Sequence, residues 1–421
     1  MKYSLPRGTR DILGKEMEIW KKVERHLCSL MERYGYREIR TPVFEETDLF
    51  IRSVGETSDI VSKEMYTFSD RKGRSLTLRP ENTAPVMRAY LENGLQREGG
   101  ITKFYYMGPM FRYDKPQAGR YRQFHQIGAE AIGSDNPAVD AEIIDLSIRI
   151  HSSLGLEGLI VKLNSVGCLK CRNSFLKVMR AELKGMKDRL CDDCVVRADS
   201  NPLRVLDCKV CEEVKGDLPV ITDYICDECR EHFDALIGIL DKMSISYEID
   251  PLLVRGLDYY TRTAYEIIHT ELGAQNALCG GGRYDGLAEE LGGGYIPAVG
   301  FSAGMERLIQ VLDTDLLVKA GESPRAYFVV FSKSCSVPAM MLAQRLRESG
   351  MEAYVDLSLR NVKKQLRSAS RDLYDYAVFI GENELKSQKA VVKNLSRGSQ
   401  EEVSFDRISE YFIREGVEKV D

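Results

Sequence analysis

Residues 101–131, ITKFYYMGPMFRYDKPQAGRYRQFHQIGAEA, decide the fold of this chain. Two runs rich in strand-forming residues flank a loop over residues 114–119, which contains Pro116 and Gly119. This arrangement predicts a long antiparallel hairpin. Because side chains alternate between the two faces of a strand, parity assigns the residues of the return strand to faces. One face carries Arg120, Arg122, Phe124, Gln126, Gly128 and Glu130.

This face suits a flat, charged ligand better than it suits solvent or a hydrophobic core. A guanidinium presents a planar fork of donors to phosphate oxygens. The ring of Phe124 can stack on a base, and Gly128 lets a ligand approach the backbone. The carboxylate of Glu130 can accept a hydrogen bond from a polar substrate group. The alternative is a sheet edge that carries solvated charges.

Residues 111–126, FRYDKPQAGRYRQFHQ, resemble the second signature motif of class II aminoacyl-tRNA synthetases. Together with the preceding GPM, this segment is similar in sequence to the histidyl-tRNA synthetase family in particular. The resemblance implies an ATP site formed by Arg112, Asp114, Arg120, Phe124 and Arg307. Many class II enzymes have glutamate where this chain has Asp114. In the same loop, Gln117 and Arg120 are expected to contact the acceptor end of tRNA.

Length and composition exclude several classes of protein. A chain of 421 residues, 43% hydrophobic and 29% charged, is long enough for two or three domains with buried cores. The net charge of -5 creates no overall positive field, so nucleic acid must be bound through local patches. The N-terminus shows no apolar signal-peptide core, and no run of about 18 apolar residues predicts a membrane span. We therefore expect a cytoplasmic protein.

The first 50 residues predict a helix followed by a strand. Apolar residues recur at helical spacing over residues 16–34, and Gly35 can end that helix. A strand is expected over residues 36–44, at a sheet edge or an interface, because Pro42 cannot donate to a ladder. This pair of elements resembles the first class II motif, which implies a homodimer.

Residues 79–84, RPENTA, lead from a short strand into a helix that starts near Ala84. They resemble the RPEGTA element of the same family, with Asn82 in place of the usual glycine. The resemblance implies that Glu81 and Thr83, with Gln126, hold the α-amino group of an amino acid. The alternative is an ordinary helix start, with an acid near the positive end of the helix dipole.

Four CxxC pairs lie within a segment that we expect to be a separate insertion. Eleven cysteines without a secretory signal argue against a disulfide framework. CxxC pairs are typical of tetrahedral zinc sites, and eight thiolates suffice for two such structural sites. An iron–sulfur cluster or a set of reduced core cysteines is the alternative. We expect a first site from Cys191, Cys194, Cys208 and Cys211, and a second from Cys168, Cys171, Cys226 and Cys229.

The segment LVRGLDYYTRT, residues 253–263, resembles a signature specific to histidyl-tRNA synthetases. Arg255 stands beside a glycine, from where it can reach a carboxylate or an α-phosphate. The resemblance implies that Tyr260 and Glu130 read the imidazole, and that the arginines 112, 255 and 307 are catalytic. The alternative for Arg255 is a surface ion pair with Asp258. The full histidine site is expected to contain Glu81, Thr83, Arg112, Gln126, Glu130, Arg255, Leu257, Tyr259 and Tyr260.

Two further motifs complete the expected catalytic body. Residues 280–287, GGGRYDGL, resemble the second histidine-specific signature, and the glycines permit close backbone approach to a ligand. Residues 299–311, VGFSAGMERLIQV, resemble the third class II motif, a strand of small residues leading into a helix. That resemblance implies that Arg307 reaches the γ-phosphate of ATP. The alternative is a tightly packed strand–helix corner with a surface arginine.

Beyond Pro324, strands and helices alternate, which predicts a small α/β domain with a mixed sheet that ends in one strand and one helix. A helix over residues 360–373 carries a basic stripe, suited to phosphate contacts. A solvated helix face is the alternative. The segment VDLSLRNVKKQLRSAS resembles the anticodon-binding domain of histidyl-tRNA synthetases. The stripe contributes Arg360, Lys363, Lys364 and Arg367 to the expected tRNA contacts, with Arg371 on the same side.

The expected fold is an α+β catalytic domain on an antiparallel sheet flanked by helices, with a Cys-rich insertion and a C-terminal α/β anticodon-binding domain. The expected bounds are 1–165 and 241–320 for the catalytic domain, 166–240 for the insertion and 324–421 for the last domain. The resemblance implies activation of L-histidine with ATP and Mg²⁺, followed by transfer of the histidyl group to tRNA(His). Two alternatives are a non-catalytic paralogue, such as a regulatory subunit of ATP phosphoribosyltransferase, and an RNA-binding sensor without turnover.

Overall fold

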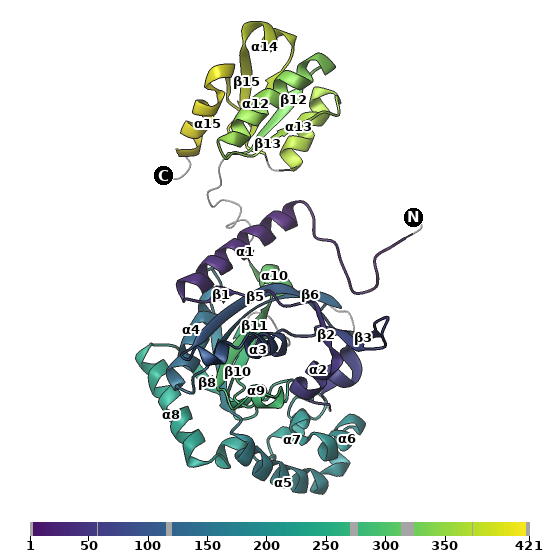
Figure 1. The fold of residues 1–421 in the computed structure, drawn as a ribbon, viewed down its shortest axis with the longest axis vertical. Coiled ribbons are helices and arrows are strands. Elements are labelled where there is room, and N and C mark those ends of the chain that lie inside the picture. Colours follow the sequence, from purple (N-terminus) through teal and green to yellow (C-terminus); the bar gives the residue numbers. More distant parts are fainter. Residues whose placement is uncertain are drawn as a thin grey trace. The chain divides into compact units, whose positions relative to one another are not determined.

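The computed structural model describes residues 3–56, 58–114, 120–269, 277–312, 324–372 and 374–417, with side chains as far as residue 414. The chain forms two compact units (Figure 1). The first comprises Met1–Asp11 and Val23–Asp313, and the second comprises Ile12–Lys22 and Thr314–Asp421. Helix α1, Lys15–Arg33, confirms the helix expected over residues 16–34.

An eight-stranded sheet forms the centre of the first unit (Figure 1). Its strands in spatial order are β1 (Arg37–Glu38), β5 (Thr102–Phe111), β6 (Gln123–Ile132), β11 (Ala298–Gly304), β10 (Ala277–Arg283), β9 (Thr261–His269), β7 (Leu159–Ser165) and β8 (Tyr247–Ile249). Neighbouring strands are antiparallel except for the outermost pairs, β1 with β5 and β7 with β8. The expected antiparallel sheet, with the hairpin β5–β6 inside it, is confirmed.

The prediction of a single strand over residues 36–44 is wrong. Two short strands replace it: β1 at the edge of the large sheet, and β2 (Phe44–Glu46) in a second sheet, with β4 (Ser75–Leu78) and β3 (Tyr66–Ser69). The buried Arg79 explains the break, because its Nη1 donates to the carbonyl of Thr41 at 3.0 Å and to that of Pro42 at 3.4 Å. These carbonyls are thereby occupied by a side chain rather than by a neighbouring strand.

Helices and helical turns surround the large sheet in the first unit. They are α2 (Thr47–Val54), the π-helical turn Ile60–Glu64, α3 (Thr83–Glu92), the turn Leu95–Arg97, α4 (Pro137–Ser152), α8 (Asp227–Lys242), α9 (Leu287–Glu290) and α10 (Met305–Val311). Helix α4 buries its apolar side against β6, β9, β10 and β11, and α8 packs on α4. Helix α3 begins where the RPENTA motif predicts, so that motif lies at a buried helix N-terminus.

The Cys-rich insertion is helical. It contains α5 (Leu169–Gly185), Lys187–Arg189, α6 (Asp192–Ser200), the 3-10 helix η4 (Pro202–Val205), α7 (Glu212–Lys215), Ile221–Asp223 and α8. Buried residues such as Phe175 and Leu203 belong to the same hydrophobic cluster as Tyr259 and Tyr260. The insertion therefore shares a core with the segment that resembles the histidine signature.

The second unit has a five-stranded mixed sheet. Its order is β13 (Ala353–Val355), β12 (Ala326–Val330), β14 (Tyr376–Ile380), β15 (Lys389–Asn394) and β16 (Gln400–Ser404). The first three strands are parallel and the last two antiparallel, which confirms the expected mixed sheet. The prediction of one final strand and helix is wrong, because a hairpin, β15–β16, and an extra helix, α14, stand there. The helical segments are Lys333–Cys335, α12 (Ser336–Glu348), α13 (Val362–Arg371), α14 (Glu382–Ser387), Phe405–Arg407 and α15 (Ile408–Val417).

The two faces of this sheet are covered by different helices. Phe328 and Val330 belong to the cluster that contains residues of α12 and α15, whereas Tyr327 and Val329 pack with Ala369 of α13. Among the residues that the structure describes, no helix in either unit is long and apolar enough to cross a bilayer.

Candidate active site

On one face of the large sheet, strand register brings small residues of β6, β11 and β10 next to one another. Across β6, β11 and β10, Gly128 pairs with Ser302, and Ser302 pairs with Gly280. Paired residues of neighbouring strands share a face, as do alternate residues within a strand. We call this the site face. Its members include Gln126, Gly128, Glu130, Gly300, Ser302, Gly280 and Glu266.

The side chain of Glu130 lies across the sheet in the space left by a glycine. A Cβ on Gly300 would come within 1.7 Å of Glu130 Oε2. The carboxylate is buried and accepts hydrogen bonds from Thr83 Oγ1 at 2.8 Å and from the hydroxyl of Tyr284. Burial raises the pKa of Glu130 to about 8. Sequence reasoning missed Tyr284, although it lies inside the GGGRYDGL motif.

Glu81 caps helix α3. Its Oε2 accepts from the backbone N–H of Thr83 at 2.7 Å, and its Oε1 from that of Ala84 at 3.1 Å. Burial raises the pKa of this carboxyl. The same cap puts the Thr83 hydroxyl on Glu130, so the helix start and the site face form one hydrogen-bonded group. The ordinary helix-start interpretation of Glu81 is thus compatible with a place in the site.

Arg112 and Phe124 lie at the loop end of the hairpin. The guanidinium carbon lies 5.4 Å from the centre of the Phe124 ring, and Arg112 Nε donates to the carbonyl of Pro80 at 2.8 Å. Burial lowers the pKa of Arg112. Nearby on β6, Gln126 Nε2 donates to Ser302 Oγ at 3.5 Å, while Gln126 Oε1 is buried with no partner in the part of the chain that the structure describes.

Arg255 lies over β10 and faces Glu266. A Cβ on Gly280 would meet Arg255 Nη2 at 2.0 Å, so this glycine makes room for the arginine. Arg255 Nη1 forms an ion pair with Glu266 Oε1, and its guanidinium lies 6.0 Å from the Tyr260 ring. The alternative of a pair with Asp258 is therefore wrong. The glycines of the motif also accommodate protein neighbours, since a Cβ on Gly282 would meet the carbonyl of Thr263 at 2.3 Å.

Three tyrosines line the same region. The ring centres of Tyr259 and Tyr260 are 4.8 Å apart, and those of Tyr259 and Tyr284 are 5.6 Å apart. All three are buried, and burial raises the pKa of Tyr260 to about 12. Leu257 is partly buried against the cluster that contains Phe50. These residues connect the LVRGLDYY segment to Glu130 and hence to the site face.

Arg307 belongs to the third motif and lies in the first turn of helix α10. Its Nη1 donates to the carbonyl of Ala277 at 2.6 Å. Burial lowers the pKa of Arg307, and the charge of Arg120 adds to this effect. Arg120 itself forms a 3.0 Å ion pair with Asp114. The hypothesis that Gln117 contacts tRNA falls outside the described residues.

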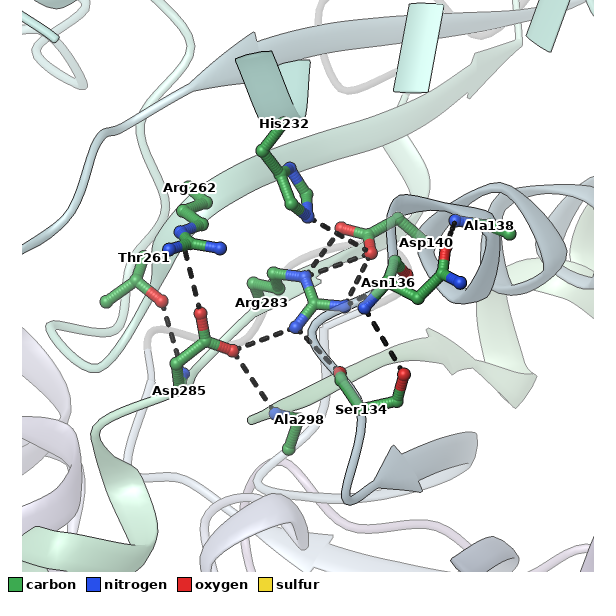
Figure 2. Close-up of polar contacts among 10 residues, drawn as sticks. All are labelled: Ser134, Asn136, Ala138, Asp140, His232, Thr261, Arg262, Arg283, Asp285 and Ala298. Atoms are coloured by element: carbon green, nitrogen blue, oxygen red, sulfur yellow. Dashed lines mark hydrogen bonds and ion pairs between the residues drawn. The ribbon is translucent and has the colours of Figure 1, made fainter. Parts of the chain in front are cut away.

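The charged residues of the GGGRYDGL motif belong to a separate buried network. Figure 2 shows Arg283 of β10 between two carboxylates, with Nη2 donating to Asp140 at 2.7 Å and Nη1 to Asp285 at 3.0 Å. Arg283 and Asp140 are fully buried, and His232 of α8 lies 3.7 Å from Asp140 (Figure 2). These charges join β10 to helices α4 and α8, so they hold the sheet in register with its covering helices.

The eight CxxC cysteines form two groups of four. In each group the four Sγ atoms lie within 4.8 Å of one another, and the inner and outer pairs combine as predicted. Four thiolates about 2.3 Å from a tetrahedral zinc ion are about 3.8 Å apart. The Sγ separations include 3.9 Å between Cys171 and Cys229 and 3.8 Å between Cys191 and Cys208. The donor sets fit single tetrahedral metal ions.

In the second unit, the basic stripe lies on the exposed side of α13. Lys363, Lys364 and Arg367 are exposed, and Ala369 on the opposite side is buried. The prediction that Arg360 belongs to this helix is wrong, because the helix begins at Val362, after the Asn361 cap. Arg360 instead pairs with Asp356 at 2.9 Å.

An antiparallel sheet with the motif arginine Arg255 lying over its site face, in a chain that also forms a mixed α/β unit, defines a class II aminoacyl-tRNA synthetase. Comparison with known proteins agrees. The family model described as histidyl-tRNA synthetase matches residues 8–186 and 213–308, and the model described as anticodon binding domain matches residues 326–415. The chain belongs to the histidyl-tRNA synthetase family, whose members are class II aminoacyl-tRNA ligases.

Relatives match this chain over nearly its whole length. A histidine–tRNA ligase from Caldanaerobacter subterraneus subsp. tengcongensis is 48% identical, covering 96% of this chain and 97% of the relative. One from Halothermothrix orenii is also 48% identical, covering 97% and 99%. The crystal structure of apo Staphylococcus aureus histidyl-tRNA synthetase is 37% identical, with a TM-score of 0.79, and the match covers 97% of this chain and 99% of that one.

The fold alone does not separate the enzyme from its paralogues. A structure described as an ATP phosphoribosyltransferase regulatory subunit/histidyl-tRNA synthetase, from Bacillus halodurans C, has a TM-score of 0.64 at 21% identity. It covers 87% of this chain and 97% of that one. The family model leaves out residues 187–212, which contain the whole group of Cys191, Cys194, Cys208 and Cys211.

Proposed function

We propose that this chain activates L-histidine with ATP and transfers the histidyl group to tRNA(His). One observation carries the proposal: Glu130 and Arg255 lie across glycines of the same sheet face, with Tyr260 beside Arg255. The sheet face therefore offers two groups to a ligand. Glu130 is an acceptor for an imidazole N–H, and Arg255 is a cation for a carboxylate or phosphate. Membership of the histidyl-tRNA synthetase family supports the assignment.

In the activation step, a carboxylate oxygen of histidine attacks the α-phosphorus of ATP. A phosphorus–oxygen bond forms as the bond to pyrophosphate breaks, and pyrophosphate leaves with the electron pair of that bond. Mg²⁺ bound with ATP would neutralise charge on the phosphates. Because the carboxylate is already ionised, no general base is needed, and positioning and charge neutralisation dominate. Arg112 and Arg255 flank the α-phosphate and carboxylate, Arg307 holds the γ-phosphate, and Phe124 stacks on adenine. Arg120 and Asp114 border the nucleotide.

Histidine is selected by paired polar groups. Glu130 accepts from one imidazole nitrogen and Tyr260 contacts the other, while Leu257 and Tyr259 enclose the ring. Glu81, Thr83 and Gln126 bind the α-amino group, and the unpartnered Gln126 Oε1 is available as an acceptor there. A site with buried polar groups rejects analogues that leave those groups unpaired, by a factor on the order of 10⁴.

The tRNA is proposed to contact both units. Arg120 and Gln117 approach the acceptor end, and the stripe of Lys363, Lys364 and Arg367 contacts phosphates of the anticodon stem-loop, joined at its edge by Arg360. A homodimer formed through the first class II motif, acting in the cytoplasm, completes the proposal.

Each cysteine group is proposed to hold one structural Zn²⁺. All four positions of each ion are filled by protein thiolates, so these ions stabilise the insertion and leave no open coordination position for a substrate. The first site uses Cys191, Cys194, Cys208 and Cys211, and the second uses Cys168, Cys171, Cys226 and Cys229.

The proposal is tested by ATP–pyrophosphate exchange with each standard amino acid in turn. Exchange with histidine alone, abolished by Arg255→Ala, is the expected result. Absence of exchange with every amino acid, from a folded and zinc-replete sample, would overturn the proposal. That outcome would favour the regulatory paralogue or an RNA-binding sensor.

A further inference from the structure

The loop that carries Arg255 rests on the Cys-rich insertion. Arg204, in the 3-10 helix η4, is 8% exposed. Its Nη2 donates to the carbonyl of Gly256, the residue directly after Arg255. Its Nη1 donates to Asp207 Oδ2 at 3.1 Å. One guanidinium thus joins the backbone of the histidine-signature loop to an acid of the insertion.

The insertion also holds Asp258, the acidic residue of the same loop. Asn201 Nδ2 lies 3.3 Å from both carboxylate oxygens of Asp258, and Arg204 Nη2 lies 3.9 Å from Oδ1. Arg172 Nη1 donates to the backbone carbonyl of Asp258. Side chains of the insertion therefore hold the loop at two positions, the carbonyl of Gly256 and residue 258.

These anchors lie next to the cysteine groups in the chain. Asp207 directly precedes Cys208, and Arg172 directly follows Cys171. Asn201 directly follows α6, the helix that begins after Cys191. A change in the geometry of a cysteine group would therefore move an anchor of the loop.

The junction is tightly packed. A cavity of only about 20 Å³ remains between the two parts, and its lining includes both Arg204 and Arg255. The negative charge of Asp207 acts on Arg255 as well as on Arg204. Little space is left for the loop to shift unless Arg204 shifts too.

We propose that Arg204 is a positioning residue: by fixing the Gly256 carbonyl it aims Arg255 at the carboxylate of histidine, and the cysteine group that ends at Cys208 and Cys211 keeps Arg204 in place. The inference rests on the proposed function. Arg204 does not touch the reacting atoms, so its effect reaches them only through Arg255 and leaves the adenine and γ-phosphate contacts of Phe124 and Arg307 unchanged.

The test compares Arg204→Met and Arg204→Lys with Arg189→Met. Arg189 is an insertion arginine that pairs with Asp217 at 2.8 Å and is half exposed, so it serves as the matched control. We expect Arg204→Met to raise the KM for histidine in pyrophosphate exchange about tenfold or more, and to change the KM for ATP less than about twofold. Lysine retains one donor for the Gly256 carbonyl, so it should recover part of the loss.

A second readout does not depend on turnover. Hydrogen exchange followed by mass spectrometry should become faster in residues 253–261 of Arg204→Met, with unchanged exchange in β10 and unchanged zinc content. Asp207→Asn, which keeps Arg204 but weakens its partner, should show the same pattern more weakly and serves if the methionine variant does not fold.

Three outcomes would overturn the inference. The first is an unchanged histidine KM in Arg204→Met. The second is an equal rise in both KM values. The third is loss of zinc that accounts for the whole effect. Lack of histidine-dependent exchange in the unsubstituted protein would instead overturn the proposed function, so the two failures are distinguishable.

Discussion

The guanidinium of Arg255 lies where a side chain of Gly280 would be. A single carbon added to Gly280 would meet Arg255 Nη2 at 2.0 Å and Cζ at 2.4 Å. The glycine of the strand and the arginine of the loop are thus one functional pair, although 25 positions separate them in the sequence. Gly280 is therefore required because a neighbouring side chain fills the space beside it.

Replacement of Gly280 by alanine should displace Arg255 while the fold is kept. We expect kcat/KM for histidine in pyrophosphate exchange to fall about 100-fold, because small misplacements of a charge-stabilising group are costly. Gly286→Ala is the matched control from the same motif, since no atom lies within 4 Å of its added carbon. Equal activity of the two variants would contradict the role assigned to Gly280.

Glu130 should make stability depend on pH. Because its pKa is raised from 4.5 to about 8 in the folded protein, the folded state holds this proton more tightly than the unfolded state. The stability that the neutral carboxyl contributes is present below pH 4.5 and is lost as the pH rises towards 8. Urea denaturation measures the free energy of unfolding at each pH. As the pH rises from 4.5 to 8, this free energy should fall for the original protein relative to Glu130→Gln, by at most about 1.4 kcal/mol per pH unit.

The exposed Glu182 on α5 supplies the control for that experiment, and Glu182→Gln should leave the pH dependence unchanged. A parallel pH profile for the original protein and Glu130→Gln would show that Glu130 is ionised in both folded and unfolded states, against the assignment.

Loss of the buried arginine at position 283 should destabilise the first unit. Arg283→Met leaves Asp140 as an uncompensated buried charge, which typically costs about 3–5 kcal/mol. Arg74→Met removes a comparable arginine–aspartate contact, with Asp70 at 2.7 Å, but at an exposed position. Urea denaturation should show a large shift of the midpoint for the first variant and none for the second. Similar midpoints would refute the structural role of the network.

Each cysteine group should account for one metal ion. We expect the purified protein to contain two zinc ions per chain, and Cys194→Ser and Cys229→Ser to retain about one each, because the two groups share no ligand. Cys28→Ser, which changes a cysteine outside both groups, should retain two. Mass spectrometry of the native protein and elemental analysis measure these numbers. Retention of both ions in either ligand variant would refute the corresponding site.

The basic stripe of α13 should affect tRNA and leave amino acid activation unchanged. Combined Lys363→Ala, Lys364→Ala and Arg367→Ala should raise the KM for tRNA about tenfold and weaken the salt dependence of charging, since fewer counterions are released. Pyrophosphate exchange without tRNA should be unchanged. Lys386→Ala on α14 is a control from the same unit. If the triple variant charged tRNA normally at physiological salt, the stripe would be a solvated helix face.

Local patterns were sufficient where one element or one motif carries the information. The hairpin of β5 and β6, the helix start at Thr83 and the strand–helix corner before Arg307 all stand where periodicity and turn residues predict them. The expected combination of the inner CxxC pairs with each other and of the outer pairs with each other is found as well.

What the sequence alone determined was the class of fold, the family motifs and the residue types of the site, because periodicity, turn chemistry and ligand spacing are local properties. Tertiary structure decided the partners. Arg255 pairs with Glu266 rather than with Asp258. The side chain of Glu130 occupies the space beside Gly300, and Tyr284 donates to its carboxylate. Arg204 holds the loop that carries Arg255. These contacts depend on strand register and on packing between segments far apart in the chain. Contacts between such segments follow no periodic pattern that could be recognised in the sequence.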